Sequence, residues 1–246
     1  MQGLTNTVKH LLIINGIFFF ASNLYGAFFN DLMALHFFEN PAFQFWQPIT
    51  HMFMHGSFNH ILFNMLGLWM FGSPLEQLWG RKKFLFYYFS TGLGAAALQL
   101  FAYSFTFYPI MDTLSSAGFS TRDILDSLAV GDMNLAWLEH VSRDAVQSLY
   151  NSYVVSMVGA SGALYGVLVA FAFLFPNIPL RIIFLPFLPI KAKYFVPILI
   201  FGDLFFGFTS YSMGPIAHFA HVGGALTGFA MMLYWKRNQF NKNRWN

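Results

Sequence analysis

Residues that could carry out hydrolysis interrupt two strongly apolar stretches of this chain. Ser161 lies within Gly159-Ala160-Ser161-Gly162, and His221 is followed closely by Gly224 in the other stretch. A serine hydroxyl becomes an effective nucleophile when a base within hydrogen-bonding distance removes its proton. Histidine is the most frequent base of this kind, and it can later protonate a leaving amine. The sequence therefore makes Ser161 the candidate nucleophile and His221 the candidate base of an acyl-transfer reaction.

A third apolar stretch supplies groups that could stabilise the negative charge of an acyl-transfer intermediate. His60 and Asn64 are four residues apart and share one face of a helix, so both side chains can point at one spot. The backbone N–H of Ser161, near the start of its helix, is a third candidate donor for this oxyanion hole. Tyr165, one turn after Ser161, could stack on the imidazole. No acid stands where a third member of a triad would be expected, so we predict a Ser–His dyad.

Each of these features also has a structural explanation that involves no chemistry. Small residues such as Gly162 in an apolar helix usually form a packing face, and Gly224 and Gly228 make a helix-packing motif by themselves. A single histidine inside a membrane commonly bonds a neighbouring carbonyl group. The packing interpretation nevertheless supports the catalytic one, because a Ser–His hydrogen bond requires closely approaching helices. We therefore treat Gly159, Gly162, Gly224 and Gly228 as supports of the dyad.

The composition places these stretches in a membrane. The 246 residues are 57% hydrophobic and 9% charged, with a mean hydropathy of +0.52. Soluble domains carry about 25% charged residues, so this chain has too little polar surface to cover a water-exposed globule. The absence of cysteine excludes disulfides, thiolate zinc sites and a cysteine nucleophile.

Six apolar runs are long enough to cross a bilayer, which takes roughly 17–25 residues per helix. They cover residues 8–29, 58–78, 84–105, 155–175, 194–209 and 215–234. Backbone groups in lipid must be satisfied internally, so all of these runs should be helices. The sequence thus predicts an all-α, polytopic bundle of six transmembrane helices.

The basic residues indicate the orientation of this bundle. All of them except Arg122 and Arg143 fall in the amino-terminal segment, the second and fourth connections and the tail, which lie on one side of the membrane. The positive-inside rule puts that side, and both termini, in the cytoplasm. Spans two, four and six then all run inwards, so their polar residues share one level in the outer half. We expect a multi-pass protein of the cell (inner) membrane whose active site opens to the extracytoplasmic side.

The connection at residues 106–152 is unusually long and acidic. Ser120-Thr121-Arg122-Asp123 has the pattern of a capping box, and apolar residues between Leu138 and Leu149 repeat at helical spacing. These patterns predict two short amphipathic helices at the outer surface. A solvated spacer and a role in handling substrate are equally good explanations of the segment.

The combined motifs resemble those of the rhomboid intramembrane proteases. That family carries Gly-x-Ser-Gly on its fourth core helix, His with following glycines on its sixth and His-x-x-x-Asn on its second. The matching positions here are Gly159–Gly162, then His221, Gly224 and Gly228, and finally His60 and Asn64; further matches are residues 50–55, Gly72, Glu76, Gly80 and Tyr165. The resemblance covers about residues 44–90 and 155–235. It implies a single rhomboid membrane domain over residues 1–246, with residues 106–152 as an extracytoplasmic insertion between spans three and four.

This resemblance implies an intramembrane serine endopeptidase that cleaves single-span membrane proteins within or near their transmembrane segment, with no cofactor and no metal. Its partners would be the transmembrane segments of substrates and membrane lipid, with no nucleic acid; the oligomeric state is left open. The resemblance also implies that span five and residues 211–215 form a movable gate and cap. Trp46-Gln47 departs from the Trp-Arg that the family often has, so the anchoring of the first outer loop is expected to differ.

Two other classes of function stay open at this point. The first is a catalytically silent relative that binds transmembrane helices, although such a binder has no need of Ser161, His221, His60 and Asn64 together. The second is a small transporter, which predicts polar residues through the whole depth of the membrane and an inverted repeat, and neither is evident.

Several further polar residues have more than one explanation. Asp203 lies in the middle of span five, where an acid is a functional candidate by default, but we favour a structural hydrogen bond because it lies deeper than Ser161. His218 precedes His221 by one turn but lacks the flanking glycines. His51 and His55 could suggest a metal site, yet a polar funnel that admits water is the better explanation, because no acid accompanies them.

Overall fold

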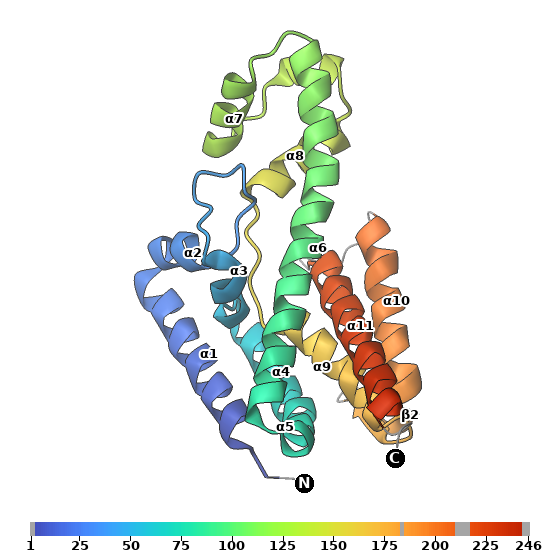
Figure 1. Ribbon diagram of the computed structural model, residues 1–246. Helices are drawn as coiled ribbons and strands as arrows, with labels where there is room; N and C mark the ends of the chain where they lie inside the picture. The colour runs from blue at the N-terminus through green and yellow to red at the C-terminus, as the bar shows by residue number, and fades with distance from the viewer. Residues whose placement is uncertain (1–2, 183–184, 210–216, 243–246) are drawn as a thin grey trace.

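The computed structural model describes residues 3–182, 185–209 and 217–242, and this part of the chain is mostly helical. The elements in chain order are α1 (Asn6–Tyr25), α2 (Ala27–Met33), α3 (Gln47–Thr50), η1 (His51–Phe53), α4 (Phe58–Gly67), η2 (Leu68–Gly72), α5 (Ser73–Trp79), α6 (Arg81–Ser116), α7 (Thr121–Val130), η3 (Leu135–Glu139), α8 (Arg143–Val154), α9 (Ser161–Leu174), β1 (Pro179–Ile182), β2 (Leu185–Lys191), α10 (Ala192–Phe208) and α11 (His218–Lys242). In Figure 1 the long helix α6 runs through the middle of the molecule, with α1 on one side of it and α10 and α11 on the other.

Helix α6 is longer than the membrane span predicted for it. The sequence pattern predicts a helix that ends near residue 105, whereas the helix continues through Pro109 to Ser116 and has 36 residues. At 1.5 Å per residue it measures about 54 Å, well above the ~30 Å hydrocarbon core of a bilayer. The helix is thus longer than one crossing requires, and the elements of the 106–152 segment lie at its last turns, as Figure 1 shows.

The second predicted span is a continuous helical path in three parts. The α-helices α4 and α5 flank η2, a short π-helix, and Gly80 (φ 76°) ends α5 and leads directly into α6. Among the described residues, length and apolar composition qualify α1 and α6 as membrane-crossing helices, and α9 is a shorter apolar helix. The other spans stay predictions, because α9 and α10 are short and the beginning of the sixth predicted span lies outside the described residues.

The structure departs from an all-α fold in one connection. Strands β1 and β2 pair antiparallel between α9 and α10, with Pro179 opposite Lys191 and Leu180 opposite Ile190. Proline lacks the N–H and the free φ that a helix interior needs, and residues 176, 179, 186 and 189 are all proline. The run of apolar residues here is consequently a hairpin and not an extension of either helix.

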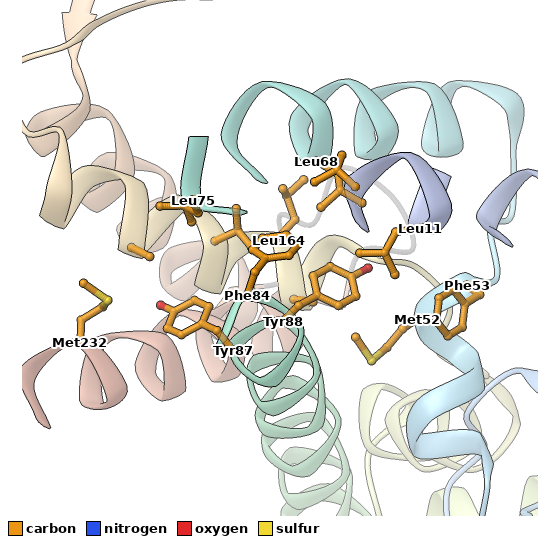
Figure 2. Packing of buried hydrophobic residues seen from close by; sticks show 14 residues of the cluster. Leu11, Met52, Phe53, Leu68, Leu75, Phe84, Tyr87, Tyr88, Leu164 and Met232 are labelled. Carbon is orange, nitrogen blue, oxygen red and sulfur yellow. The ribbon is translucent and has the colours of Figure 1, made fainter. Parts of the chain in front are cut away.

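The main apolar core lies where the inner parts of α1, η2, α5, α6 and α9 meet, with η1 at one edge. Figure 2 shows its largest side chains, which are Leu11, Met52, Phe53, Leu68, Leu75, Phe84, Tyr87, Tyr88, Leu164 and Met232. The Tyr87 hydroxyl also donates a hydrogen bond to the carbonyl oxygen of Gly166 at 2.9 Å. This packing fixes α9 against α6, and it thereby fixes the height of the residues at the start of α9.

The start of α1 is fastened to α5 by one carboxylate. Glu76 accepts hydrogen bonds from the backbone N–H groups of Thr7 and Val8 at 2.9 and 3.0 Å and from the Thr5 hydroxyl. The first N–H groups of a helix have no partner inside the helix, so an acid at this position satisfies them and favours the helix dipole. Glu76 therefore acts as an amino-terminal cap supplied by another helix.

The 106–152 segment forms a small folded unit with an apolar core. Helices α7 and α8, predicted from the sequence, are present, and Ser120 and Ser142 cap their first turns. Trp137, between the two helices, is buried together with Ile124 and Leu149 against the last turns of α6. The segment is thus more ordered than a solvated spacer would be.

Candidate active site

Ser161 and His221 lie within hydrogen-bonding distance of each other. The Oγ atom of Ser161 is 2.8 Å from Nε2 of His221, although the two residues are 60 positions apart. Ser161 is the first residue of α9, and His221 lies in the first turn of α11. The His221 side chain is 13% exposed, so the pair is largely shielded from its surroundings.

Glycines let the two helices approach closely enough for this contact. A methyl group on Gly224 would lie 1.9 Å from the carbonyl oxygen of Gly162, and one on Gly228 would lie 2.9 Å from the Cα atom of Gly166. Real Cβ atoms essentially never come closer than 3.0 Å to such atoms. Helices α9 and α11 therefore touch through their backbones at two levels, where Gly162, Gly224 and Gly228 lie.

The face of the His221 imidazole is also in contact with an aromatic side chain. The ring of Tyr165 stacks on it with a centroid distance of 4.3 Å and an interplanar angle of 10°. This is the stacking that the spacing of Ser161 and Tyr165 predicts. It leaves the imidazole little freedom to tilt away from Ser161.

The expectation that no acid stands beside the base is wrong. The Oδ1 atom of Asp203, on α10, is 3.1 Å from Nδ1 of His221 and 2.6 Å from Nδ1 of His218. The Tyr165 hydroxyl is also near enough to interact with this carboxylate. Asp203 is buried, at 7% exposed, so the carboxylate is enclosed by the groups that bond it.

The misplacement of Asp203 has a geometric cause. The expected span placed this residue in mid-membrane, but α10 ends at Phe208, and only four residues lie between Asp203 and that end. His221 lies just three residues after the start of α11. Because α10 and α11 are consecutive antiparallel helices, residues near the end of one and the start of the other share one depth. The depth of Asp203, if measured from the facing ends of α10 and α11 and not from the middle of the hydrophobic run, predicts its contact with His221.

His60 lies close to Ser161 at the rim of the same site. A methyl group on Gly159 would sit 2.8 Å from Nε2 of His60 and 3.5 Å from Oγ of Ser161, so both atoms border one small volume. Gly159 also has a φ of +126°, which L side chains rarely adopt, and its N–H donates to the carbonyl oxygen of His51 at 2.9 Å. Glycine at 159 is thus required both by the backbone and by the space that His60 occupies.

Asn64 is buried one turn further along α4. Its Nδ2 atom donates to the carbonyl oxygen of His60 at 3.0 Å. A primary amide carries two N–H groups, so a second one is available beyond this bond. The backbone N–H of Ser161 starts α9 and has no intrahelical acceptor, as expected for a helix start.

His51 and His55, which precede α4, are both buried, whereas Ser57 is exposed. Burial lowers the pKa of His51 and of His55 from 6.5 to about 4, so both rings are neutral at pH 7. The Nδ1 atom of His51 lies 2.9 Å from the carbonyl oxygen of Gln47, to which a neutral ring donates. Ser57 accepts a hydrogen bond from the His60 N–H and caps α4.

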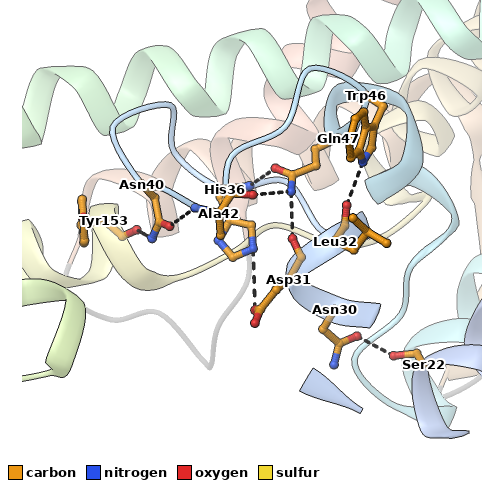
Figure 3. Close-up of polar contacts among 10 residues, drawn as sticks. All are labelled: Ser22, Asn30, Asp31, Leu32, His36, Asn40, Ala42, Trp46, Gln47 and Tyr153. Carbon is orange, nitrogen blue, oxygen red and sulfur yellow. Dashed lines mark hydrogen bonds and ion pairs between the residues drawn. The ribbon is translucent and has the colours of Figure 1, made fainter. Parts of the chain in front are cut away.

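Gln47 anchors the first outer loop. Its Nε2 atom donates to the carbonyl oxygens of Asp31 and Ala42 at 2.9 and 2.8 Å, and its Oε1 atom accepts from the His36 N–H at 3.2 Å. Figure 3 shows these bonds beside that of the Trp46 indole to the Leu32 carbonyl. The neutral amide is fully buried, so this loop is anchored by a donor and an acceptor of one side chain without any charge.

The described ranges 3–182, 185–209 and 217–242 contain no set of side chains suited to binding a metal ion. No group of three or more His, Cys, Asp or Glu side chains there could hold a metal ion. His51 and His55, considered for such a site, have no acid placed with them. The expected cap at residues 211–215 lies outside the described residues.

Comparisons with known proteins agree with this geometry. The model of the Rhomboid domain matches residues 42–122 and 133–238. The chain is 34% identical over 50 residues to YdcA of Bacillus subtilis, which is named a candidate rhomboid protease; the match covers 20% of this chain and 25% of YdcA. It is 44% identical over 43 residues to the rhomboid protease GlpG of Salmonella newport, covering 18% of this chain and 16% of GlpG, and the same holds for GlpG of Salmonella heidelberg. These pairwise matches span a quarter or less of each relative, whereas the domain match extends over most of the chain. The chain is a membrane protein and belongs to the rhomboid family.

Proposed function

We propose that this protein is an intramembrane serine endopeptidase that cleaves single-span membrane proteins within or near their transmembrane segment. The observation that carries the proposal is the 2.8 Å distance between Ser161 Oγ and His221 Nε2. Its membership of the rhomboid family supports protease activity and membrane-embedded substrates. A purely structural Ser–His contact would not need Tyr165 stacked on the imidazole and His60 placed beside the hydroxyl.

The proposed reaction begins with attack of Ser161 Oγ on the carbonyl carbon of the scissile peptide bond, while the hydroxyl proton passes to Nε2 of His221. Collapse of the tetrahedral intermediate breaks the carbon–nitrogen bond, and His221 gives the proton to the leaving amine. Water then attacks the acyl-enzyme as His221 takes one of its protons. Return of that proton to Oγ releases the new carboxyl terminus and restores Ser161.

The oxyanion of the intermediate needs donors that are already in place. The proposed donors are the backbone N–H of Ser161 together with the side chains of His60 and Asn64. The proximity of His60 Nε2 and Ser161 Oγ to the same point beside Gly159 supports this assignment. A side chain at position 159 would collide with His60, so glycine there lets His60 stay beside Ser161.

The proposed membrane topology has six spans, with both termini in the cytoplasm and the dyad opening to the outside. The start of α1, the turn between α5 and α6, the hairpin and the end of α11 lie at one end of the molecule, with α7 and α8 at the other (Figure 1). Most basic residues of the sequence belong to the first of these ends. That distribution supports a cytoplasmic location for it, and it supports residues 106–152 as an extracytoplasmic insertion in a single rhomboid domain.

The proposal is tested with purified protein in detergent and a fluorescently labelled single-span substrate. Ser161→Ala should abolish cleavage, whereas Ser104→Ala, a matched change on α6 where the hydroxyl bonds only within its own helix, should cleave like the wild type. A silent helix-binding protein would give no cleavage with either form. Cleavage by Ser161→Ala at the wild-type rate would refute the proposal.

The assignment of the base has its own test. His221→Ala should also abolish turnover. An active His221→Ala protein that loses activity on further change of His218 would move the role of base to His218.

A further inference from the structure

A general base must present a lone pair and not a proton to the nucleophile. In neutral imidazole one nitrogen carries the hydrogen and the other accepts, and the hydrogen bond made by one nitrogen decides the state of the other. His221 faces Ser161 through Nε2. It can therefore act as base only while its hydrogen resides on Nδ1.

The carboxylate of Asp203 supplies the acceptor that this tautomer requires. A carboxylate is an acceptor only, so the 3.1 Å contact between its Oδ1 atom and His221 Nδ1 needs a hydrogen on Nδ1. We propose that Asp203 is a positioning residue for the protease reaction, holding His221 in the Nδ1–H tautomer and stabilising the imidazolium that forms when Ser161 loses its proton. The inference rests on the proposed function, which it extends from a dyad to a Ser–His–Asp arrangement.

His218 holds the carboxylate in place. Its Nδ1 atom lies 2.6 Å from the same Oδ1 atom, and both side chains are 8% exposed. The Tyr165 hydroxyl is near enough to interact with the same carboxylate. An acid carried by α10 is thereby fixed relative to α9 and α11, so the distance to His221 does not depend on the rotamer of a free side chain.

The charged and titratable groups around His221 come from four helices. Asp203 faces it from α10, Tyr165 from α9 and His218 from its own helix α11, while His60 on α4 is near enough to interact with its charge. Asp203 is the one acid among these groups. An imidazolium at position 221 is consequently stabilised by a single carboxylate. Removing that negative charge should raise the free energy of the transition state and leave the affinity for substrate unchanged.

The first experiment compares Asp203→Asn with Asp112→Asn, an exposed acid on α6 that serves as the matched carboxyl-to-amide control. In a Ser–His–Asp site the loss of the acid lowers kcat by about 10⁴-fold. We expect Asp203→Asn to lower kcat by about 10²–10⁴-fold, with KM within about twofold of wild type, because the effect lies in the transition state. The rate at which a fluorophosphonate probe acylates Ser161 should fall in parallel. His218→Gln should lower kcat less than Asp203→Asn does.

Two results of this experiment would overturn the proposal. One is a wild-type acylation rate in folded Asp203→Asn. The other is a loss confined to KM, which would indicate a role in substrate access. If Ser161→Ala is inactive and Asp203→Asn is fully active, the proposed function stands and only the role of Asp203 is refuted. Cleavage at the wild-type rate by Ser161→Ala would refute both.

A second measurement needs no folded variant at position 203. Nitrogen NMR of ¹⁵N-histidine-labelled wild-type protein in detergent, with His221→Ala used to assign the signals, reports which imidazole nitrogen carries the hydrogen. We expect hydrogen on Nδ1 of His221 in the neutral ring. A His221 that is protonated on Nε2 in the resting enzyme would overturn the proposal, whatever the stability of Asp203→Asn.

Discussion

The contact between α9 and α11 predicts a large effect of adding one methyl group. In Gly224→Ala the new Cβ atom would lie 1.9 Å from the Gly162 carbonyl oxygen, while ordinary contact begins at 3.4 Å. The helices must therefore separate by about 1.5 Å at this level to restore ordinary contact. His221 lies one turn before Gly224 on the same helix, so its imidazole moves with that shift.

The effect on activity follows from the distance that the shift adds. The Ser161–His221 contact is 2.8 Å, so a displacement of this size takes it out of hydrogen-bonding range. A misplacement of about 1 Å can reduce a rate about 10²-fold, which corresponds to about 2.7 kcal/mol in the activation barrier. Overpacking should also lower the free energy of unfolding by about 1–3 kcal/mol.

The assay is cleavage of a labelled single-span substrate in detergent, with thermal unfolding of the same samples. Gly16→Ala on α1 is the matched control, because nothing lies within 4 Å of its Cβ position. Alanine there should leave kcat/KM unchanged and stabilise α1 slightly. A Gly224→Ala protein with wild-type kcat/KM would refute the argument that backbone contact between α9 and α11 sets the dyad distance.

Other parts of the structure predict further effects. Gly159→Ala forces a side chain onto a φ of +126° and against His60, so kcat/KM should fall by at least about 10-fold in the cleavage assay. Asn64→Ala should lower kcat by up to about 10²–10³-fold if its free N–H serves the oxyanion. Gln47→Glu cannot donate to the Asp31 and Ala42 carbonyls, so thermal unfolding should show a loss of roughly 2–5 kcal/mol. Burial lowers the pKa of His51 to about 4, against 6.5 in the unfolded chain. The resulting contribution to the free energy of unfolding is complete above pH 6.5 and is lost as the pH falls from 6.5 to 4. The loss is roughly 3 kcal/mol and should appear as a fall in Tm between about pH 7.5 and about pH 4.5.

Each of these predictions has a contrary result. Full activity of Gly159→Ala would show that the space beside His60 is not used. An unchanged rate in Asn64→Ala would remove that residue from the oxyanion hole. Equal stability of Gln47→Glu and wild type would mean that the outer loop is held elsewhere. His51→Asn, which cannot titrate but keeps a donor for the Gln47 carbonyl, should show a flatter pH dependence than wild type, and an equally steep one would contradict the role of His51.

Residue spacing predicted the parts of the site that depend on one helix or on backbone contact. Tyr165 stacks on His221 because one turn separates it from Ser161, and Gly162 and Gly224 meet because small residues at that spacing mark a packing face. Asp203 was misjudged because the depth of a residue was inferred from the middle of a hydrophobic run, while the end of α10 is what sets its level. The hairpin was missed for a related reason, since its apolar residues continue the hydrophobicity of the neighbouring spans although prolines prevent a helix.

The position of Asp203 also explains how so many polar groups can be buried at one level. Burying an isolated carboxylate in an apolar environment is unfavourable in free energy, and so is burying an unpaired imidazole. Here Asp203 accepts from His218 and His221, and His221 in turn bonds Ser161, so each group reduces the desolvation penalty of the next. The arrangement that makes burial tolerable is therefore the same one that directs the lone pair of His221 at Ser161. Substituting Asp203 with alanine would leave its partners without their shared acceptor, whereas asparagine keeps an acceptor oxygen for one of them, which is why asparagine separates the chemical role from the structural one.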